Sequence, residues 1–264
     1  MSEDWLRTDV GSSTPDSITV RGHDLANEIM GTMSFSDVAF LLAAGRTPTE
    51  AESTVFNAVL VSLADHGLTP TALAARLTYT GAPEALQGAI AAGLLGGGSV
   101  FLGPVEDTAT FLHSILGSMD EDADDEALRA SAVKAVEDAL GAGRKIPGLG
   151  HPIHKHGDPR TPRLYEIAAE AGLAGPHMRL LELVAAALRE ASGKDLPING
   201  AGVAGAALAD LGFPPHLTRG FALLARTAGL IGHLAEEAER PIGMRLWKEV
   251  DDRASSAEGA VETD

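Results

Sequence analysis

Apolar residues recur every three to four positions through most of the chain, which is the spacing of one face of an α-helix. The stretches with this spacing are residues 37–44, 48–65, 128–140, 164–171, 176–191, 201–211 and 223–239. Ser34 or Ser36 is suited to cap the first helix and Gly45 to end it, and Arg240-Pro241 ends the last one. A short extended segment at residues 18–24 precedes them. The pattern predicts an all-α protein.

Composition supports closely packed helices, because 45% of the 264 residues are hydrophobic but only 4% are aromatic. The formal net charge of −17 disfavours nucleic acid and anionic membranes as partners, since both are polyanions. Part of this charge lies in the acidic run 120–126, which we expect to be solvated surface. The glycine-rich run 93–103 has no Gly-Lys-Ser/Thr and therefore predicts a tight helix contact or hinge, not a phosphate loop.

The chain has no cysteine, which excludes disulfides, cysteine nucleophiles and thiolate metal sites. Residues 1–16 are polar and lack the basic-then-apolar pattern of a signal peptide. No stretch reaches the roughly 18 uninterrupted apolar residues that a membrane helix needs. We therefore expect a cytoplasmic protein without membrane contact.

The segment 148–160, Gly-Leu-Gly-His-Pro-Ile-His-Lys-His-Gly-Asp-Pro-Arg, has the densest concentration of reactive side chains. Gly148 and Gly150 allow the backbone to approach a ligand closely. The imidazole of His151 can exchange protons near neutral pH, and the planar guanidinium of Arg160 suits a carboxylate. This combination predicts a pocket that binds an acid and moves protons.

A metal site is the alternative for this segment, because His151, His154 and His156 form a His-x-x-His-x-His run. The chain offers no thiolate, however, and no His-Glu-x-x-His helix accompanies the three imidazoles. We therefore expect no metal.

Several ordered segments resemble the citrate synthase superfamily, and within it the citryl-CoA lyase group, which includes the lyase module of ATP-citrate lyase. The resemblance covers about residues 16–250 and is carried by residues 21–24, 35–49, 64–67, 148–160, 225–233 and 239–241. It implies an all-α, citrate-synthase-like fold that forms an intertwined homodimer or a higher homo-oligomer. Each subunit would have a large domain, residues 17–100 and 206–250, and a small mobile domain, residues 101–205. Flexible tails at 1–16 and 251–264 would flank them.

The resemblance also implies a reaction that interconverts a 3-hydroxy-3-carboxyacyl-CoA, such as citryl-CoA, with acetyl-CoA and an oxoacid. By this likeness His151 acts on the hydroxyl or carbonyl oxygen. His66, Arg160, Arg226 and Arg240 hold substrate carboxylates, and Arg240 reaches across from a second subunit. His66 and Asn199 are also counted with His151 as catalytic residues, and Phe101 as a substrate-binding residue. Coenzyme A is part of the substrate, and no permanently bound cofactor is implied. The residues implied to contact it are Arg144, Lys145, Ile146, Pro147, Gly148, Leu149, Gly150 and Lys155.

Two positions depart from the synthases. Asn199 stands where they have a catalytic carboxylate, and an amide cannot act as a general base. Phe101 stands where they have a histidine that supports the enolate, and the lyase module of ATP-citrate lyase also has Phe there. Asn199 can still hydrogen-bond an enolate or thioester oxygen. Three hypotheses remain: a citryl-CoA lyase, a citrate or methylcitrate synthase, and a non-catalytic CoA-binding homologue.

Overall fold

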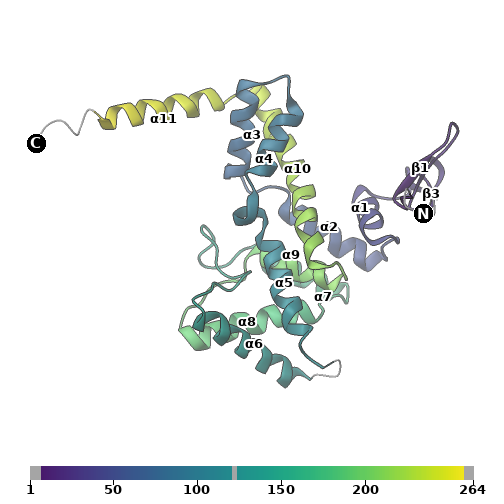
Figure 1. Cartoon of the computed structure of the whole chain (residues 1–264), viewed down its shortest axis with the longest axis vertical. Coiled ribbons are helices and arrows are strands. Elements are labelled where there is room, and N and C mark those ends of the chain that lie inside the picture. The colour runs from purple at the N-terminus through teal and green to yellow at the C-terminus, as the bar shows by residue number, and fades with distance from the viewer. Residues whose placement is uncertain (1–6, 121–123, 259–264) are drawn as a thin grey trace, which may run out of the picture. The chain divides into compact units, whose positions relative to one another are not determined.

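The computed structural model describes residues 7–120 and 124–258 (Figure 1). Helices make up most of it, and the predicted helical fold is confirmed. Its internal contacts divide the chain into two compact units. Unit 1 consists of Met1–Ser62 and Val105–Thr218, and unit 2 of Leu63–Pro104 and Arg219–Asp264. Each unit is therefore assembled from segments that are far apart in the sequence.

Unit 1 begins with a small antiparallel sheet of order β1-β2-β3. Its strands are β1 Gly11–Ser13, β2 Ile18–Val20 and β3 His23–Asp24. The predicted extended segment at 18–24 is thus confirmed. Residues 11–13, which we assigned to a polar tail, instead pair with β2, and the hydroxyls of Ser12 and Thr19 lie 2.7 Å apart across the strands.

Most helices of unit 1 match the predicted apolar periods. The helical elements of this unit are the π-helical turn η2 Leu25–Ile29, α1 Phe35–Ala44, α2 Glu50–Ala64, α5 Pro104–Leu116, α6 Asp125–Gly141, α7 Arg160–Glu170, α8 Pro176–Ser192 and α9 Gly200–Asp210, although the last two residues of α2 and the first residue of α5 belong to unit 2. Of these, η2 and α5 were not among the predicted helices. Of the two candidate caps for α1, Ser34 is the one used, in a capping box with Asp37. Gly45 ends the helix in the left-handed conformation, as expected.

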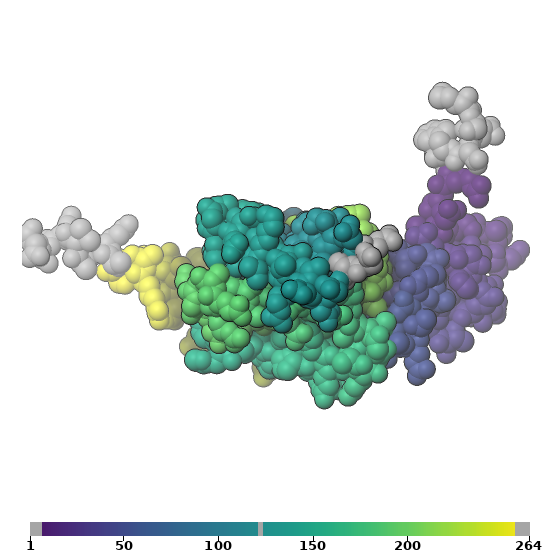
Figure 2. All heavy atoms as spheres, turned by 90° about the horizontal axis from the view of Figure 1, so that it is seen from below, coloured from purple at the N-terminus to yellow at the C-terminus, as the bar shows by residue number. Residues whose placement is uncertain are grey.

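Aromatic and small side chains share the core of unit 1. Phe40 packs edge-on against Phe56 and Phe213, with ring centroids 5.4 and 5.0 Å apart. The small residues of α9 let it approach α5 closely, since a Cβ atom at Gly205 would lie 2.4 Å from the carbonyl oxygen of Val105. In the space-filling view, the teal and green residues of α5 to α9 form one continuous packed surface (Figure 2).

Unit 2 has a smaller core. Its elements are α3 Pro70–Gly81, α4 Leu86–Leu95, the π-helical turn η3 Gly98–Leu102, α10 Pro215–Glu239 and α11 Gly243–Glu258, although the first residues of α10 still belong to unit 1. Ala75, Ala89, Leu230 and Leu234 are buried together between α3, α4 and α10. A Cβ atom at Gly93 would lie 2.7 Å from Leu230, so the glycine run does provide the predicted tight helix contact.

Some predicted boundaries moved. Residues 251–258, which we assigned to an acidic tail, continue helix α11. Within the acidic run 120–126, Asp124 caps α6, and Asp125 and Glu126 lie in its first turn. Their negative charges interact favourably with the dipole of the helix. Residues 121–123 lie outside the described residues. The division into a large and a small mobile domain near residues 100 and 205 stays a prediction. None of the described helices combines the length and apolar character that a membrane span requires.

Candidate active site

We call residues 148–160 of unit 1 the histidine loop. Its first three residues are held by the segment that precedes α9. Leu149 and Ile198 form an isolated antiparallel bridge. The amide of Gly150 donates to the carbonyl of Pro197 at 2.7 Å, and the amide of Asn199 donates to that of Gly148 at 2.9 Å. The break that the sequence shows at residues 197–199 therefore serves to hold the loop.

Gly148 is required where the loop meets α9. Its φ of +81° is left-handed, and a Cβ atom there would lie 3.0 Å from the side chain of Thr108 and 3.1 Å from the Cα of Gly202. The predicted close backbone approach is thus made to neighbouring helices. Gly150, with φ +77°, supplies a second left-handed residue just before His151.

The protonation of His151 is directed by the backbone. Its Nδ1 accepts hydrogen bonds from the amides of Ile153 and His154, each at 3.1 Å. A nitrogen that accepts two N–H groups carries no proton, so the neutral ring has its proton on Nε2. The ring centroid of His154 lies 4.5 Å away. His151 is therefore a half-buried imidazole whose Nε2–H is a hydrogen-bond donor.

Asn199 is the N-cap of α9. Its Oδ1 accepts from the amide of Gly202 at 2.8 Å, and its Nδ2 donates to the carbonyl of Gly150 at 2.7 Å. Both the oxygen and the nitrogen of the side-chain amide therefore bond backbone groups, and the second N–H of Nδ2 takes part in neither bond. Direct contact of this side chain with an enolate stays a prediction.

Arg160, at the first position of α7, is paired within the protein. Its Nε and Nη2 donate to the two carboxylate oxygens of Asp158 at 2.9 and 2.6 Å, and its Nη1 donates to the carbonyl of Ser62 at 3.3 Å. The amide of Gly200 also donates to Asp158, at 2.7 Å. Burial acts to raise the pKa of Asp158, but the hydrogen bonds from Arg160 and Gly200 outweigh it and hold the pKa far below its usual range.

A substrate carboxylate at Arg160 would therefore share the guanidinium with Asp158. Asp158 was not among the predicted site residues. The available signal was that Asp158 and Arg160 stand only two positions apart.

The predicted coenzyme A segment divides into buried and exposed parts. Arg144, Lys145 and Lys155 are exposed and free to meet phosphates, whereas Ile146 is buried and Pro147 half-buried. Their role in binding coenzyme A stays a prediction.

In unit 2, His66 lies in the turn that follows α2. The carboxylate of Asp65 accepts from the amide of Gly67 at 2.8 Å and so closes the turn around His66. Arg226 on α10 is buried, and its Nη1 lies 3.8 Å from the same carboxylate. Two of the predicted carboxylate-binding residues thus lie beside one aspartate.

The other two predicted residues of unit 2 are exposed. Arg240 is 77% exposed and pairs with Glu236 at 2.9 Å, which is the surface ion pair expected of an i,i+4 spacing. Phe101 lies on η3 and is 47% exposed. Their roles toward a substrate stay predictions.

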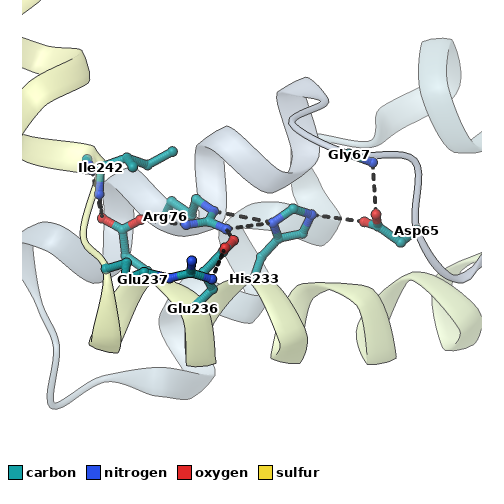
Figure 3. A network of polar contacts seen from close by, with 9 residues as sticks. Asp65, Gly67, Arg76, His233, Glu236, Glu237 and Ile242 are labelled. Atoms are coloured by element: carbon teal, nitrogen blue, oxygen red, sulfur yellow. Dashed lines mark hydrogen bonds and ion pairs between the residues drawn. The ribbon is translucent and has the colours of Figure 1, made fainter.

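A chain of polar contacts in unit 2 was missed by the sequence analysis (Figure 3). Arg76 of α3 pairs with Glu237 at 2.9 Å and with Glu236, and its Nη2 lies 3.0 Å from the Nδ1 of His233. The Nε2 of His233 in turn lies 2.9 Å from Asp65. These contacts join residues about 160 positions apart, so no local pattern announces them.

The chain is similar to proteins of one family. The family described as "Citrate synthase, C-terminal domain" matches residues 50–248. The citryl-CoA lyase from Hydrogenobacter thermophilus is 32% identical, with a TM-score of 0.79 over 88% of this chain and 87% of that one. The ATP citrate lyase of Methanosaeta concilii, solved in complex with (3S)-citryl-CoA, is 22% identical and shares the fold, with a TM-score of 0.74 over 89% of this chain and 39% of that one.

A curated relative, the citrate synthase of Haloferax volcanii, is 26% identical over 204 residues. The match covers 74% of this chain and 49% of that protein, so the chain spans about half the length of this relative. The family match extends over most of the chain and includes the histidine loop, the His66 turn and the Arg226 helix. The chain belongs to the citrate synthase family.

Proposed function

We propose that the protein is a carbon–carbon lyase that cleaves citryl-CoA, or a close 3-hydroxy-3-carboxyacyl-CoA, into acetyl-CoA and oxaloacetate or the matching oxoacid. The observation that carries this proposal is the 32% identity to a citryl-CoA lyase over nearly the full length of both chains. Phe101 and Asn199, which depart from the synthases, support the same choice.

A condensing activity of the citrate synthase type is the second candidate. It is favoured by the 26% identity to the Haloferax citrate synthase. Retention of His66, His151 and three candidate arginines argues against a homologue that merely binds coenzyme A.

The proposed reaction is a retro-aldol cleavage. A base removes the proton of the tertiary hydroxyl, the oxygen becomes the carbonyl of oxaloacetate, and the bond to the methylene carbon beside the thioester breaks. The electron pair of that bond forms the thioester enolate, which takes a proton on carbon to give acetyl-CoA. Atoms and electrons balance without any oxidant or cofactor.

His151 is suited to stabilise the negative charge that develops on the hydroxyl oxygen as the base removes its proton. Its Nε2–H can donate to that oxygen, because its Nδ1 is engaged by the amides of Ile153 and His154. For His151 to accept the hydroxyl proton on Nε2, the proton already on Nε2 would have to move to Nδ1. The loop amides would then have to release Nδ1. The imidazole of His154, 4.5 Å from His151 between ring centroids, is a second base for this step.

The charge of the substrate fits the basic residues that are predicted to bind it. Citryl-CoA carries carboxylates, for which Arg160, Arg226, Arg240 and His66 are the predicted partners. The exposed Arg144 and Lys145 beside the histidine loop suit the phosphates of coenzyme A.

The test is incubation of the full chain with citryl-CoA, with oxaloacetate followed through malate dehydrogenase and NADH. We expect oxaloacetate release by the natural protein and its loss in His151→Ala, by at least about 100-fold if the donor stabilises the transition state. The thermal midpoint of the variant should stay close to that of the natural protein. Activity retained in His151→Ala would refute the role of this residue.

The condensing alternative is tested with acetyl-CoA and oxaloacetate, by reading free coenzyme A with a thiol reagent. The chain has no cysteine, so the protein itself gives no background in this assay. Coenzyme A release without citryl-CoA cleavage would favour the synthase. Binding of acetyl-CoA without either reaction would favour the non-catalytic homologue.

A further inference from the structure

The face of α10 that meets α3 and the His66 turn carries three polar side chains and one glycine, one residue per helical turn. Arg226, Gly229, His233 and Glu237 follow one another at spacings of three and four residues, so they share a single face. A Cβ atom at Gly229 would lie 2.1 Å from the carbonyl oxygen of Ala64. The helix therefore passes directly over the backbone at the start of the His66 turn, and only glycine permits this approach.

His233 connects the two ends of this face. A guanidinium is always a donor, so the contacts of Arg76 with the Nδ1 of His233, at 3.0 and 3.3 Å, require Nδ1 to be the acceptor. The proton of the neutral ring is then on Nε2, which donates to Asp65 at 2.9 Å. The side chain of His233 is only 12% exposed, so solvent competes little for these bonds.

The far end of the chain of contacts is firmly anchored. The side chains of Arg76 and Glu237 are each 2% exposed and pair at 2.9 Å. Glu237 also accepts from the amides of Ile242 and Gly243 at 2.9 and 2.7 Å, at the start of α11. Because a buried charge without its partner is costly, Arg76 is held in one place and directs the ring of His233 (Figure 3).

The near end holds the His66 turn. Asp65 accepts from His233 and from the amide of Gly67, and the guanidinium of Arg226 lies 3.8 Å from it. Burial acts to raise the pKa of Asp65, but these hydrogen bonds outweigh it and keep the pKa below its usual value. A charged Asp65, held by His233 and bonded to the amide of Gly67, thus fixes the backbone on both sides of His66.

We propose that His233 and Asp65 are positioning residues, which use the anchor of Arg76 and Glu237 to hold His66 and Arg226 in the geometry that binds the substrate carboxylates. The proposal rests on the proposed function for the nature of the substrate. Its structural content, that the orientation of His66 depends on His233, is independent of that function. Neither residue needs to touch the substrate.

The first test is a double-mutant cycle in citryl-CoA cleavage by the full chain. We expect His233→Leu to lower kcat/KM by about 10- to 100-fold, as a displaced binding group does. In a His66→Ala background the same change should cost clearly less than in the natural protein, because one of the two residues through which it acts is gone. Losses that multiply in the double variant would overturn the proposal.

Two further variants separate positioning from general stability. His233→Gln retains an acceptor for Arg76 and a donor for Asp65 and should restore activity to within about 3-fold of the natural protein. Asp65→Asn, at a residue 46% exposed, should reproduce the loss of His233→Leu even if the leucine variant folds poorly. His216→Leu, an exposed histidine of the same helix, is the matched control and should leave activity unchanged.

The second test does not use activity. In ¹⁵N NMR spectra of the imidazoles, His233 should show the neutral Nε2–H form, and the signals of His66 should shift in His233→Leu and not in His216→Leu. If the natural protein cleaves no citryl-CoA, the proposed function fails and this test alone decides the positioning. His66 signals unchanged in His233→Leu would overturn it.

Discussion

At the scale of single residues, Asn199 explains how an amide serves in a position that we assigned to a catalytic carboxylate. Its Nδ2 holds the carbonyl of Gly150 at 2.7 Å, directly before His151, and its Oδ1 caps α9. A carboxylate could make the cap but not the bond to Gly150, because it has no proton to donate. The amide is therefore what ties the histidine loop to the helix.

Asn199→Asp is expected to weaken the protein and not to improve condensation. The change places a negative oxygen against the carbonyl of Gly150 and should cost about 1–3 kcal/mol of unfolding free energy, which corresponds to a fall of roughly 2–4 °C in thermal midpoint per kcal/mol for a chain of this size. Calorimetry measures the midpoint, and the thiol assay measures condensation.

Asn199→Ser is the matched control, because serine keeps a cap for α9 and loses only the bond to Gly150. It should fall between the natural protein and Asn199→Asp in stability. If Asn199→Asp left the thermal midpoint unchanged and raised coenzyme A release from acetyl-CoA and oxaloacetate, the result would contradict this account. It would indicate that a carboxylate at position 199 reaches the substrate.

The sequence was sufficient to predict which residues form the candidate site, but not which residues hydrogen-bond or pair with them. The density of glycine, histidine and arginine in residues 148–160 singled out the loop, and the structure shows it fixed beside α9. The partners of its functional groups were not predictable in the same way. Asp65 and His233 are 168 positions apart, and such a contact depends on the packing of α10 against the turn.

At the scale of elements, the start of α2 shows how a local motif is stabilised by a distant charge. The amide of Thr49 donates to Glu52 at 2.8 Å, and the amide of Glu52 donates to the hydroxyl of Thr49 at 3.2 Å, which is a capping box. Arg46 adds two bonds to the same carboxylate, at 2.6 and 2.8 Å. The guanidinium of Arg46 and the amide of Thr49 hold the pKa of Glu52 at about 2.

Glu52→Gln should therefore destabilise the protein in a pH-dependent way. The pKa of Glu52 is about 2 in the folded chain against 4.5 ordinarily, so its contribution is complete above pH 4.5 and is lost as the pH falls toward 2. We expect a loss of about 1–2 kcal/mol at pH 7, discounted because Arg46 is half-exposed, and a smaller loss at pH 3.5. Urea unfolding at several pH values measures it.

Glu166→Gln is the control for this experiment, because Glu166 forms an exposed ion pair with Arg163 on α7. It should change stability by less than about 0.5 kcal/mol at every pH. A difference between Glu52→Gln and the natural protein that grows as the pH falls would show that the sign of this argument is wrong.

Helix boundaries were predictable where an apolar period met a cap, and not where it did not. Ser34, Gly45 and the apolar run between them predicted α1 almost to the residue. Helix α11 was missed, because Arg240-Pro241 was taken to end the last helix and because the second half of α11 is polar and exposed, which in a sequence looks the same as a tail. Strand β1 was missed for a similar reason, since Gly11–Ser13 has no apolar alternation.

At the scale of the whole molecule, composition was sufficient to predict a helical protein but not its division. Each unit combines two separate segments of the chain, and α10 passes from one unit to the other without interruption. No change of composition marks the transitions near residues 62, 104 and 218, because the helices there are continuous or closely joined. Only tertiary contacts reveal where the units begin and end.

Helix α11 presents apolar side chains that nothing in the described chain covers fully. Met244, Trp247 and Val250 are 49%, 55% and 68% exposed, and their spacing of three residues puts them along one side of the helix. Large exposed apolar side chains grouped on one face are typical of surfaces that bind another protein. The predicted homodimer would provide a second copy of this chain as the partner.

We expect the protein to sediment as a dimer of two 27.2 kDa chains at micromolar concentration, and Trp247→Glu to weaken dimerisation by at least about 10-fold, because an aromatic anchor would be replaced by a charge. Lys248→Glu, at the next position of the same helix, changes the net charge by two instead of one and should leave the dimer intact. Equal weakening by both variants would attribute the effect to charge alone. A natural protein that sediments as a single 27.2 kDa chain up to high micromolar concentration would contradict the homodimer itself, and Arg240 would then have to act within its own subunit.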